Sequence, residues 1–258
     1  VPPAAVAWAG YANNYANALA DRFDASGDVA DLRRAVELFR QAQQSAQPRI
    51  VEASGYGSNL ALGLADLAVV TGQVPYLREA VTTLRASLAQ LPSGHPERAY
   101  RLANLADLIR QQSRLTYADG EGNREHAQAL VVDAVETAAE GVEAAGSSDA
   151  RLLPALANQA RAMRWARALG VVIWSAADVL NVQRRATQLV QISPGERFGQ
   201  CAAWARDAQA AGDREDLLAA YGQAVALTPE VAWLGLTTGE RMRLLGMMSE
   251  VLVNAVHA

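Results

Sequence analysis

Large apolar residues recur at helical spacing from the start of the chain. In the first segment they fall three and four positions apart: Trp8, Tyr11, Tyr15, Leu19 and Phe23. This spacing predicts an amphipathic helix over residues 4–25. A Gly-Asp pair then ends that helix and caps the next, which the apolar pattern extends over residues 29–46. The two helices predict a helical hairpin.

The same pattern returns at a fixed period. Asn14, Asn59 and Asn104 are spaced 45 residues apart, each within an alanine- and leucine-rich helix that ends in a glycine turn. A period of this size indicates stacked supersecondary units. We therefore predict one all-α domain over residues 1–258, a right-handed α-solenoid of about five helical hairpins closed by a C-terminal capping helix. The predicted hairpins span residues 4–47, 48–92, 96–146, 147–192 and 194–229, and the capping helix spans residues 238–257.

Composition narrows the classes of function. The chain has 258 residues, 51% of them hydrophobic and 19% charged, with a formal charge of −4, so it has no basic field for nucleic acid. Its single cysteine excludes an intrachain disulfide and fits a reducing, cytoplasmic compartment. No apolar run reaches the ~18–20 residues of a membrane span. The chain starts with Val1 rather than Met, which leaves open that it is a piece of a longer protein.

The fifth unit carries the clearest family resemblance. Trp204-Ala205, Gly212-Asp213, Ala220-Tyr221, Ala224-Val225 and Pro229 resemble a tetratricopeptide repeat (TPR). The earlier units, such as 31–38, resemble the longer variant of actinobacterial proteins. The final segment, 230–236, resembles the region that precedes a CHAT domain, a caspase-like peptidase module. These resemblances imply a TPR scaffold that binds a protein or an extended peptide, and a covalently linked CHAT peptidase as one partner it could regulate.

Candidates for catalysis and for metal binding are few. Cys201 lacks the glycine that follows a caspase-type cysteine and takes the place of a large packing residue, so we predict that it lies in the core. His95, His126 and His257 fall in a turn, at a helix start and at the chain end, and we assign none of them as a ligand or base. Residues 119–123 alternate oxygen side chains but lack the glycine and glutamate of a calcium loop. We expect no enzyme activity, no metal and no cofactor.

The turn at residues 171–174 is unusual because it is apolar. Val171, Val172, Ile173 and Trp174 occupy a position that is normally polar in a solenoid. Either this turn folds back onto neighbouring helices or it forms a contact patch for another domain, and we favour packing.

The partner-binding face can be placed by analogy with TPR arrays, where first helices line a concave groove. The residues so placed are Asn13, Asn17, Asp21, Leu62, Asp66, Asp107, Arg110, Gln111, Arg161, Arg164, Trp165 and Arg206. Acidic and amide groups line the front of this face and guanidinium groups the back. Arginine can hold a peptide carboxylate with two hydrogen bonds. Two alternatives remain open at this point. The residues can be an ordinary solvated face, and the chain can be a structural spacer or self-association domain without a groove function.

Overall fold

The computed structural model describes residues 3–46, 50–232 and Gly246. The described residues form α-helices and one short 3₁₀ turn without a strand, which confirms the predicted all-α class. The chain divides into two compact units, Val1–Ala144 and Ala145–Ala258, and each is described by itself. The predicted capping helix lies outside the described residues, and a single domain over the whole chain stays a prediction.

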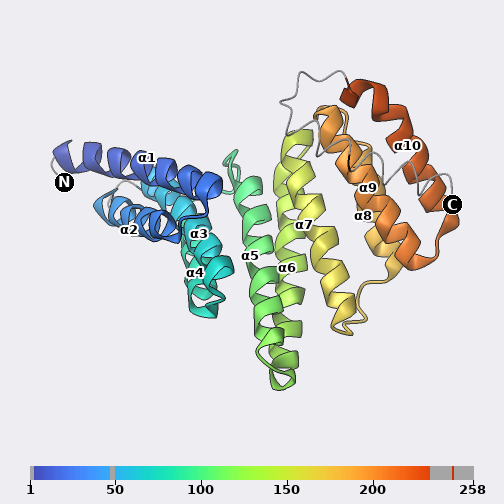
Figure 1. Cartoon of the computed structure of the whole chain (residues 1–258), viewed down its shortest axis with the longest axis horizontal. Helices are drawn as coiled ribbons and strands as arrows, with labels where there is room; N and C mark the ends of the chain where they lie inside the picture. The colour runs from blue at the N-terminus through green and yellow to red at the C-terminus, as the bar shows by residue number, and fades with distance from the viewer. Residues whose placement is uncertain (1–2, 47–49, 233–245, 247–258) are drawn as a thin grey trace. The chain divides into compact units, whose positions relative to one another are not determined.

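The first unit contains three helical hairpins (Figure 1). Its helices are α1 (Pro3–Ser26), α2 (Val29–Ala46), α3 (Ile50–Thr71), α4 (Val74–Ala89), α5 (Arg98–Ala118) and α6 (Arg124–Ala145), with the 3₁₀ turn η1 (Glu121–Asn123) before α6. Gly27 and Gly72 adopt φ of 74° and 68°, the left-handed conformation that ends a helix and that other residues adopt at a cost. These glycines end α1 and α3, the first helices of their hairpins.

The second unit contains α7 (Asp149–Ala168), α8 (Ala176–Thr187), α9 (Pro194–Ala211) and α10 (Arg214–Ala232). Capping boxes begin both α8 and α9: Ser175 with Asp178, and Ser193 with Glu196. Each serine accepts a hydrogen bond from the backbone N–H three residues on, and each acid accepts one from the serine N–H. These boxes fix where both helices begin.

Two helix ends in the second unit differ from the prediction. Helix α8 ends at Thr187, before the predicted end of its hairpin at residue 192. Helix α10 continues through Pro229, the predicted end of its hairpin, to Ala232. The proline removes only one backbone hydrogen bond there, the one to the carbonyl of Val225, a residue that is 44% exposed and open to water. The loss is small enough for the helix to continue.

Helix α1 packs through small residues and not through its aromatic stripe. Ala9, Ala12 and Ala16 are buried at 0–2% exposure, whereas Trp8 and Tyr11 of the stripe are exposed. Alanine lets two helices approach closely, so α1 can lie tightly against α2. Of the predicted apolar positions, Leu19 is buried at 3% exposure, so the sequence pattern located the helix but only part of its buried face.

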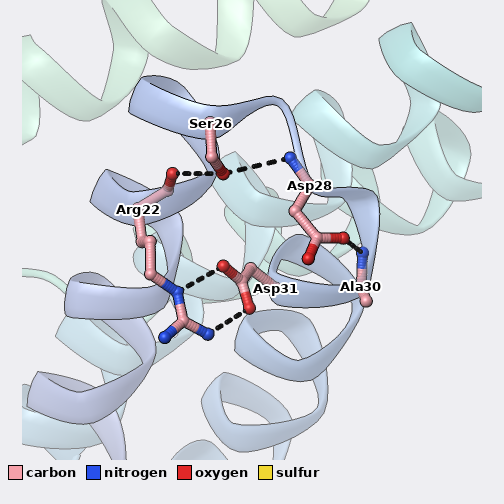
Figure 2. A network of polar contacts seen from close by, with 5 residues as sticks. All are labelled: Arg22, Ser26, Asp28, Ala30 and Asp31. Carbon is pink, nitrogen blue, oxygen red and sulfur yellow. Dashed lines mark hydrogen bonds and ion pairs between the residues drawn. The ribbon is translucent and has the colours of Figure 1, made fainter.

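A polar network closes the turn between α1 and α2 (Figure 2). Arg22 on α1 donates two hydrogen bonds to the carboxylate of Asp31 on α2, and these bonds lower the pKa of Asp31. Ser26 Oγ donates to the Arg22 carbonyl at 2.8 Å and accepts from Asp28 N at 3.2 Å. Asp28 in turn accepts from Ala30 N at 2.9 Å, which confirms its predicted role as the cap of α2.

Candidate functional site

The first unit carries a hollow of about 520 Å³ on the side of its three first helices. Helices α1, α3 and α5 each contribute side chains to it, together with the segment that leads into α5. The lining residues that carry its chemistry are Asn13, Tyr56, Asn59, Leu62, Glu97, Tyr100, Arg101 and Asn104. Of the residues predicted for the groove, Asn13 and Leu62 belong to this set.

Asparagine amides line the hollow from all three helices. Asn59 Nδ2 donates a hydrogen bond to Asn13 Oδ1 at 2.8 Å, which joins α3 to α1. The periodic residue in α1 is Asn14, yet Asn14 is exposed and its neighbour Asn13 makes the contact. Asn104, the periodic residue of α5, is half-buried in the hollow and makes no side-chain hydrogen bond with any described residue. Its amide is therefore available to a ligand.

A buried arginine lies in the wall of the hollow. The side chain of Arg101 is only 6% exposed, and one terminal nitrogen donates to the carboxylate of Glu97. The other terminal nitrogen, Nη1, is buried without a hydrogen-bond partner among the described residues. At the rim, Tyr100 is 54% exposed. The hollow thus combines amide groups, a partly paired guanidinium and an aromatic ring.

The sequence analysis missed Tyr56, Tyr100, Arg101 and Asn104. The repeat itself held part of the signal, because Tyr56 and Arg101 both stand three residues before a periodic asparagine. Residues at that position on a first helix face the preceding first helix: a Cβ at Gly10 of α1 would lie 3.8 Å from Tyr56 Oη. Their position three residues before a periodic asparagine could therefore have identified Tyr56 and Arg101 from the sequence.

The other predicted residues of the first unit lie outside the lining of this hollow. Asn17 and Asp21 are exposed on α1, and Asp66 is exposed on α3. On α5, Asp107 accepts hydrogen bonds from Arg110 at 2.7 Å and from Gln111 at 2.8 Å. Asp107 and Arg110 therefore largely neutralise each other.

Asp66 has an unusual acidity. Desolvation by the surrounding protein raises its pKa from 3.8 to about 6, and the negative charge of Asp24 on α1 adds to the shift. Near neutral pH this carboxyl group consequently changes its charge with small changes in pH.

In the second unit, Arg164 is part of a structural network. Its Nη1 donates to Asp207 Oδ1 at 3.0 Å, and Gln183 Nε2 donates to Asp207 Oδ2 at 2.6 Å. Asp207 and Gln183 are 8% and 2% exposed, so the network joins α7, α8 and α9 around a buried acid. A hollow of about 190 Å³ beside it is lined in part by Arg164 and Arg167.

The remaining predicted residues of the second unit differ in exposure. Arg161 is exposed and its Nε donates to the carbonyl of Ala157 at 3.2 Å. Trp165 is half-buried on the same helix, and Arg206 is exposed on α9. These three residues stay a predicted binding set.

Cys201 lies in the core of the second unit, as predicted. It is 1% exposed and packs in a cluster that includes Phe198, Trp204 and Tyr221. Burial raises the pKa of its thiol to about 11, so the thiol is protonated at neutral pH. A protonated, buried thiol is a poor nucleophile, and Cys201 has the properties of a packing residue.

The apolar turn between α7 and α8 packs only in part. Val172 and Ile173 are 93% and 65% exposed, so these two do not fold back as we favoured. Their neighbours Val171 and Trp174 are half-buried. Val171 N donates to the carbonyl of Ala166 at 2.9 Å, which closes the end of α7 and turns the next two side chains outward.

Within residues 3–46 and 50–232, no three His, Cys, Asp or Glu side chains are grouped so as to hold a metal ion. None of the helices in these ranges has the length and hydrophobicity needed to cross a membrane.

Comparison with known proteins identifies the type of fold. The sequence matches no protein-family profile and no curated protein. Two crystal structures of a Podosopora anserina putative kinesin light chain with nearly identical TPR-like repeats are similar to this chain, each with 22% sequence identity over 84% of it. The alignments cover 94% and 95% of those chains, with TM-scores of 0.56 and 0.55. At this identity the likeness concerns the fold alone. The chain accordingly has a TPR-like helical-repeat fold.

Proposed function

We propose that the chain is a protein-interaction module that binds an extended peptide segment of a partner along the first helices of its first unit. The observation that carries the proposal is the hollow of about 520 Å³ lined by α1, α3 and α5. Side chains from three successive hairpins line one continuous surface there. Such a surface suits a ligand that runs across the helices.

The chemistry of the lining supports a peptide as the ligand. An amide side chain has donors and an acceptor, so Asn104 can pair with a peptide N–H and C=O together. Arg101 Nη1 lacks a partner, and a carbonyl or carboxylate of the ligand can supply one after a small side-chain movement. Exposed Tyr100 offers an aromatic surface for an apolar side chain.

A peptide library displayed on phage tests this function. Peptides selected on the full chain would be measured by fluorescence polarisation against wild type, Asn104→Ala and Tyr100→Ala. We expect each substitution to weaken binding about tenfold, the effect of about 1.4 kcal/mol lost at one contact. Tyr11→Ala is the matched control, because Tyr11 is also an exposed tyrosine but does not line the hollow. Selected peptides that bind all four proteins equally would refute the proposed site.

The exposed arginines of the second unit form a separate part of the proposal. Arg161, Trp165 and Arg206 can receive an acidic segment of a partner, because guanidinium groups bind carboxylates strongly. Arg164 must stay unchanged in such a test, because its loss would break the network around Asp207. Binding of an acidic peptide by Arg161→Ala/Arg206→Ala, compared with wild type, tests this part. Equal affinities would remove it.

The partner of a TPR-like scaffold can be a domain of the same polypeptide. The resemblance of residues 230–236 to the region before a CHAT domain, and of the repeats to actinobacterial TPR proteins, supports a caspase-like peptidase as that partner. In this form of the proposal the scaffold recruits substrates or restrains the peptidase. The test is to join a CHAT peptidase to these repeats and to compare its peptidase activity with that of the same peptidase alone. Identical rates and substrate ranges would count against this form of the proposal.

A structural role is the second candidate function. Val172 and Ile173 are far more exposed than apolar side chains in a turn usually are, and exposed apolar groups favour association. In this alternative the chain is a spacer that associates through this turn. Sedimentation of wild type and Val172→Asp/Ile173→Asp tests it. A wild type that stays monomeric across concentrations would exclude self-association through the turn.

A further inference from the structure

One face of α1 presents large apolar side chains to solvent. Trp8, Tyr11 and Tyr15 are 49%, 72% and 57% exposed, and Ala18 on the same face is also exposed. Their spacing of three and four residues places them in a single line along the helix. We refer to these four residues as the outer stripe. Three neighbouring exposed aromatic rings are uncommon on a surface that contacts only water.

The internal repeat shows what happens at the equivalent positions of the next two hairpins. A shift of 45 residues takes Tyr15 to Leu60 and then to Leu105, which are 2% and 4% exposed. The same shift takes Ala18 to Gly63, which is buried, and then to Leu108, which is 3% exposed. The positions of Tyr15 and Ala18, which are exposed in α1, are thus interior positions in α3 and α5.

The element that covers these positions is the second helix of the preceding hairpin. A Cβ placed on Gly63 would lie 3.3 Å from side-chain atoms of both Val36 and Phe39 of α2. In α5, Arg98 is the equivalent of Trp8, and its Nη1 donates to the carbonyl of Leu88 on α4 at 3.3 Å. The preceding hairpin therefore packs on the position of Ala18 in α3 and on the position of Trp8 in α5.

We propose that the outer stripe is a docking face for a further helical hairpin of this same repeat type. The docking element is its second helix, which presents an apolar Val and Phe three residues apart, as α2 does with Val36 and Phe39. The face continues an interface that the chain already forms twice. The docking face ends at Arg22, which donates two hydrogen bonds to Asp31 of α2. The residue at the equivalent position of α3, Leu67, is buried. This surface is separate from the hollow between the first helices and does not depend on peptide binding.

Duplication of the first hairpin tests the proposal. A copy of residues 3–49 joined directly ahead of Pro3 places a second α2 before α1, through the same linker that joins α2 to α3. The reporter is the thiol introduced by Ala18→Cys, because the native Cys201 is buried and its alkylation does not compete. We expect the duplicated chain to gain helical circular dichroism and to be alkylated at the new thiol at least tenfold more slowly than the unduplicated Ala18→Cys chain.

Two controls make the result specific. In the first, Val36→Asp and Phe39→Asp in the added copy alone should restore the original alkylation rate, because both contacts with the stripe would be lost. In the second, the thiol of Ala129→Cys, an exposed position on α6, should react equally in all versions.

Several results would overturn the proposal. A duplicated chain that gains no helix, or that gains helix while the thiol at position 18 reacts at its original rate, shows that the stripe does not dock such a hairpin. A dimer of the unmodified chain that Tyr15→Asp dissociates would instead assign the stripe to a second copy of this chain.

Discussion

The two units join their hairpins by different chemistry. In the first unit the ion pairs between hairpins, Arg40 with Glu79 and Arg85 with Asp133, lie between side chains that are 40–51% exposed. In the second unit the acid Asp207 is 8% exposed and accepts hydrogen bonds from two other helices. A regular repeat can reuse the same small-residue contacts at every interface. Where the repeat degrades, a buried charged group, Asp207, joins the hairpins instead.

Loss of the buried acid in the second unit should have the largest effect. Asp207→Ala leaves Gln183 and part of Arg164 without their acceptor in a dry environment, so we expect the free energy of unfolding to fall by about 2–4 kcal/mol. Urea denaturation followed by circular dichroism measures the change.

The matched control is an acid of the first unit. Asp133→Ala breaks an ion pair whose side chains are 51% and 40% exposed, and it should cost less than about 1 kcal/mol. If Asp133→Ala destabilised the chain as much as Asp207→Ala, the contrast between the two units would be wrong.

Close packing in the first unit can be broken with a single methyl group. A Cβ on Gly57 of α3 would lie 2.3 Å from Ser87 Oγ on α4 and 2.8 Å from Gln43 Nε2 on α2. Gly57→Ala should therefore destabilise the chain by about 1–2 kcal/mol, because either neighbour must move.

Gly55 provides the comparison on the same helix. A Cβ there meets no atom within 4 Å, so Gly55→Ala should gain about 0.5–1 kcal/mol from the better helix propensity of alanine. Thermal unfolding of both variants would show shifts of opposite sign, and two shifts of the same sign would refute the close contact at Gly57.

Helix capping in the second unit should contribute less. Ser193 starts α9 with a full capping box, and Ser193→Ala should cost about 1 kcal/mol. Ser148 is the N-cap residue of α7 but its side chain makes no capping hydrogen bond, so Ser148→Ala should change the unfolding free energy by no more than a few tenths of that amount. Equal losses in the two variants, measured by urea denaturation, would contradict the assigned caps.

The sequence predicted the helices well because their signals are local. The glycine turns and the capping serines each act within a few residues of chain, and the period of 45 residues repeats such local signals. The observed helix starts follow them. The face that α1 buries was not predictable in this way. Its aromatic residues indicated an amphipathic helix, but whether Tyr15 is buried depends on the hairpin next to it and not on its own helix.

The candidate site was predicted less completely for the same reason. Analogy selected Asn13 and Leu62, which line the hollow, and it also selected Arg164, whose partner Asp207 lies 43 residues further along the chain. Contacts between distant residues carry no local signal. The period of 45 residues gave partial information about the site, because residues 45 positions apart occupy equivalent places in successive hairpins.

The smallest effect should be the pH dependence of Asp66 in the first unit. Its pKa is about 6 in the folded chain and 3.8 is the ordinary value, so the folded state binds this proton more tightly than the unfolded state. The stabilisation is present in full below pH 3.8 and is lost as the pH rises through 6. Asp66→Asn should therefore stabilise the chain at pH 7.5, by less than about 1 kcal/mol because solvent screens this exposed side chain, and should have no effect near pH 3.5.

The cause of the shift in Asp66 can be tested separately from its size. Desolvation is the larger cause and the charge of Asp24 the smaller, so Asp24→Asn should lower the pKa of Asp66 only part of the way toward 3.8. Titration of the Asp66 side-chain carboxyl by NMR in both proteins measures this difference. A pKa near 3.8 in Asp24→Asn would show that charge repulsion, and not the surroundings of Asp66 between its neighbouring helices, controls the group.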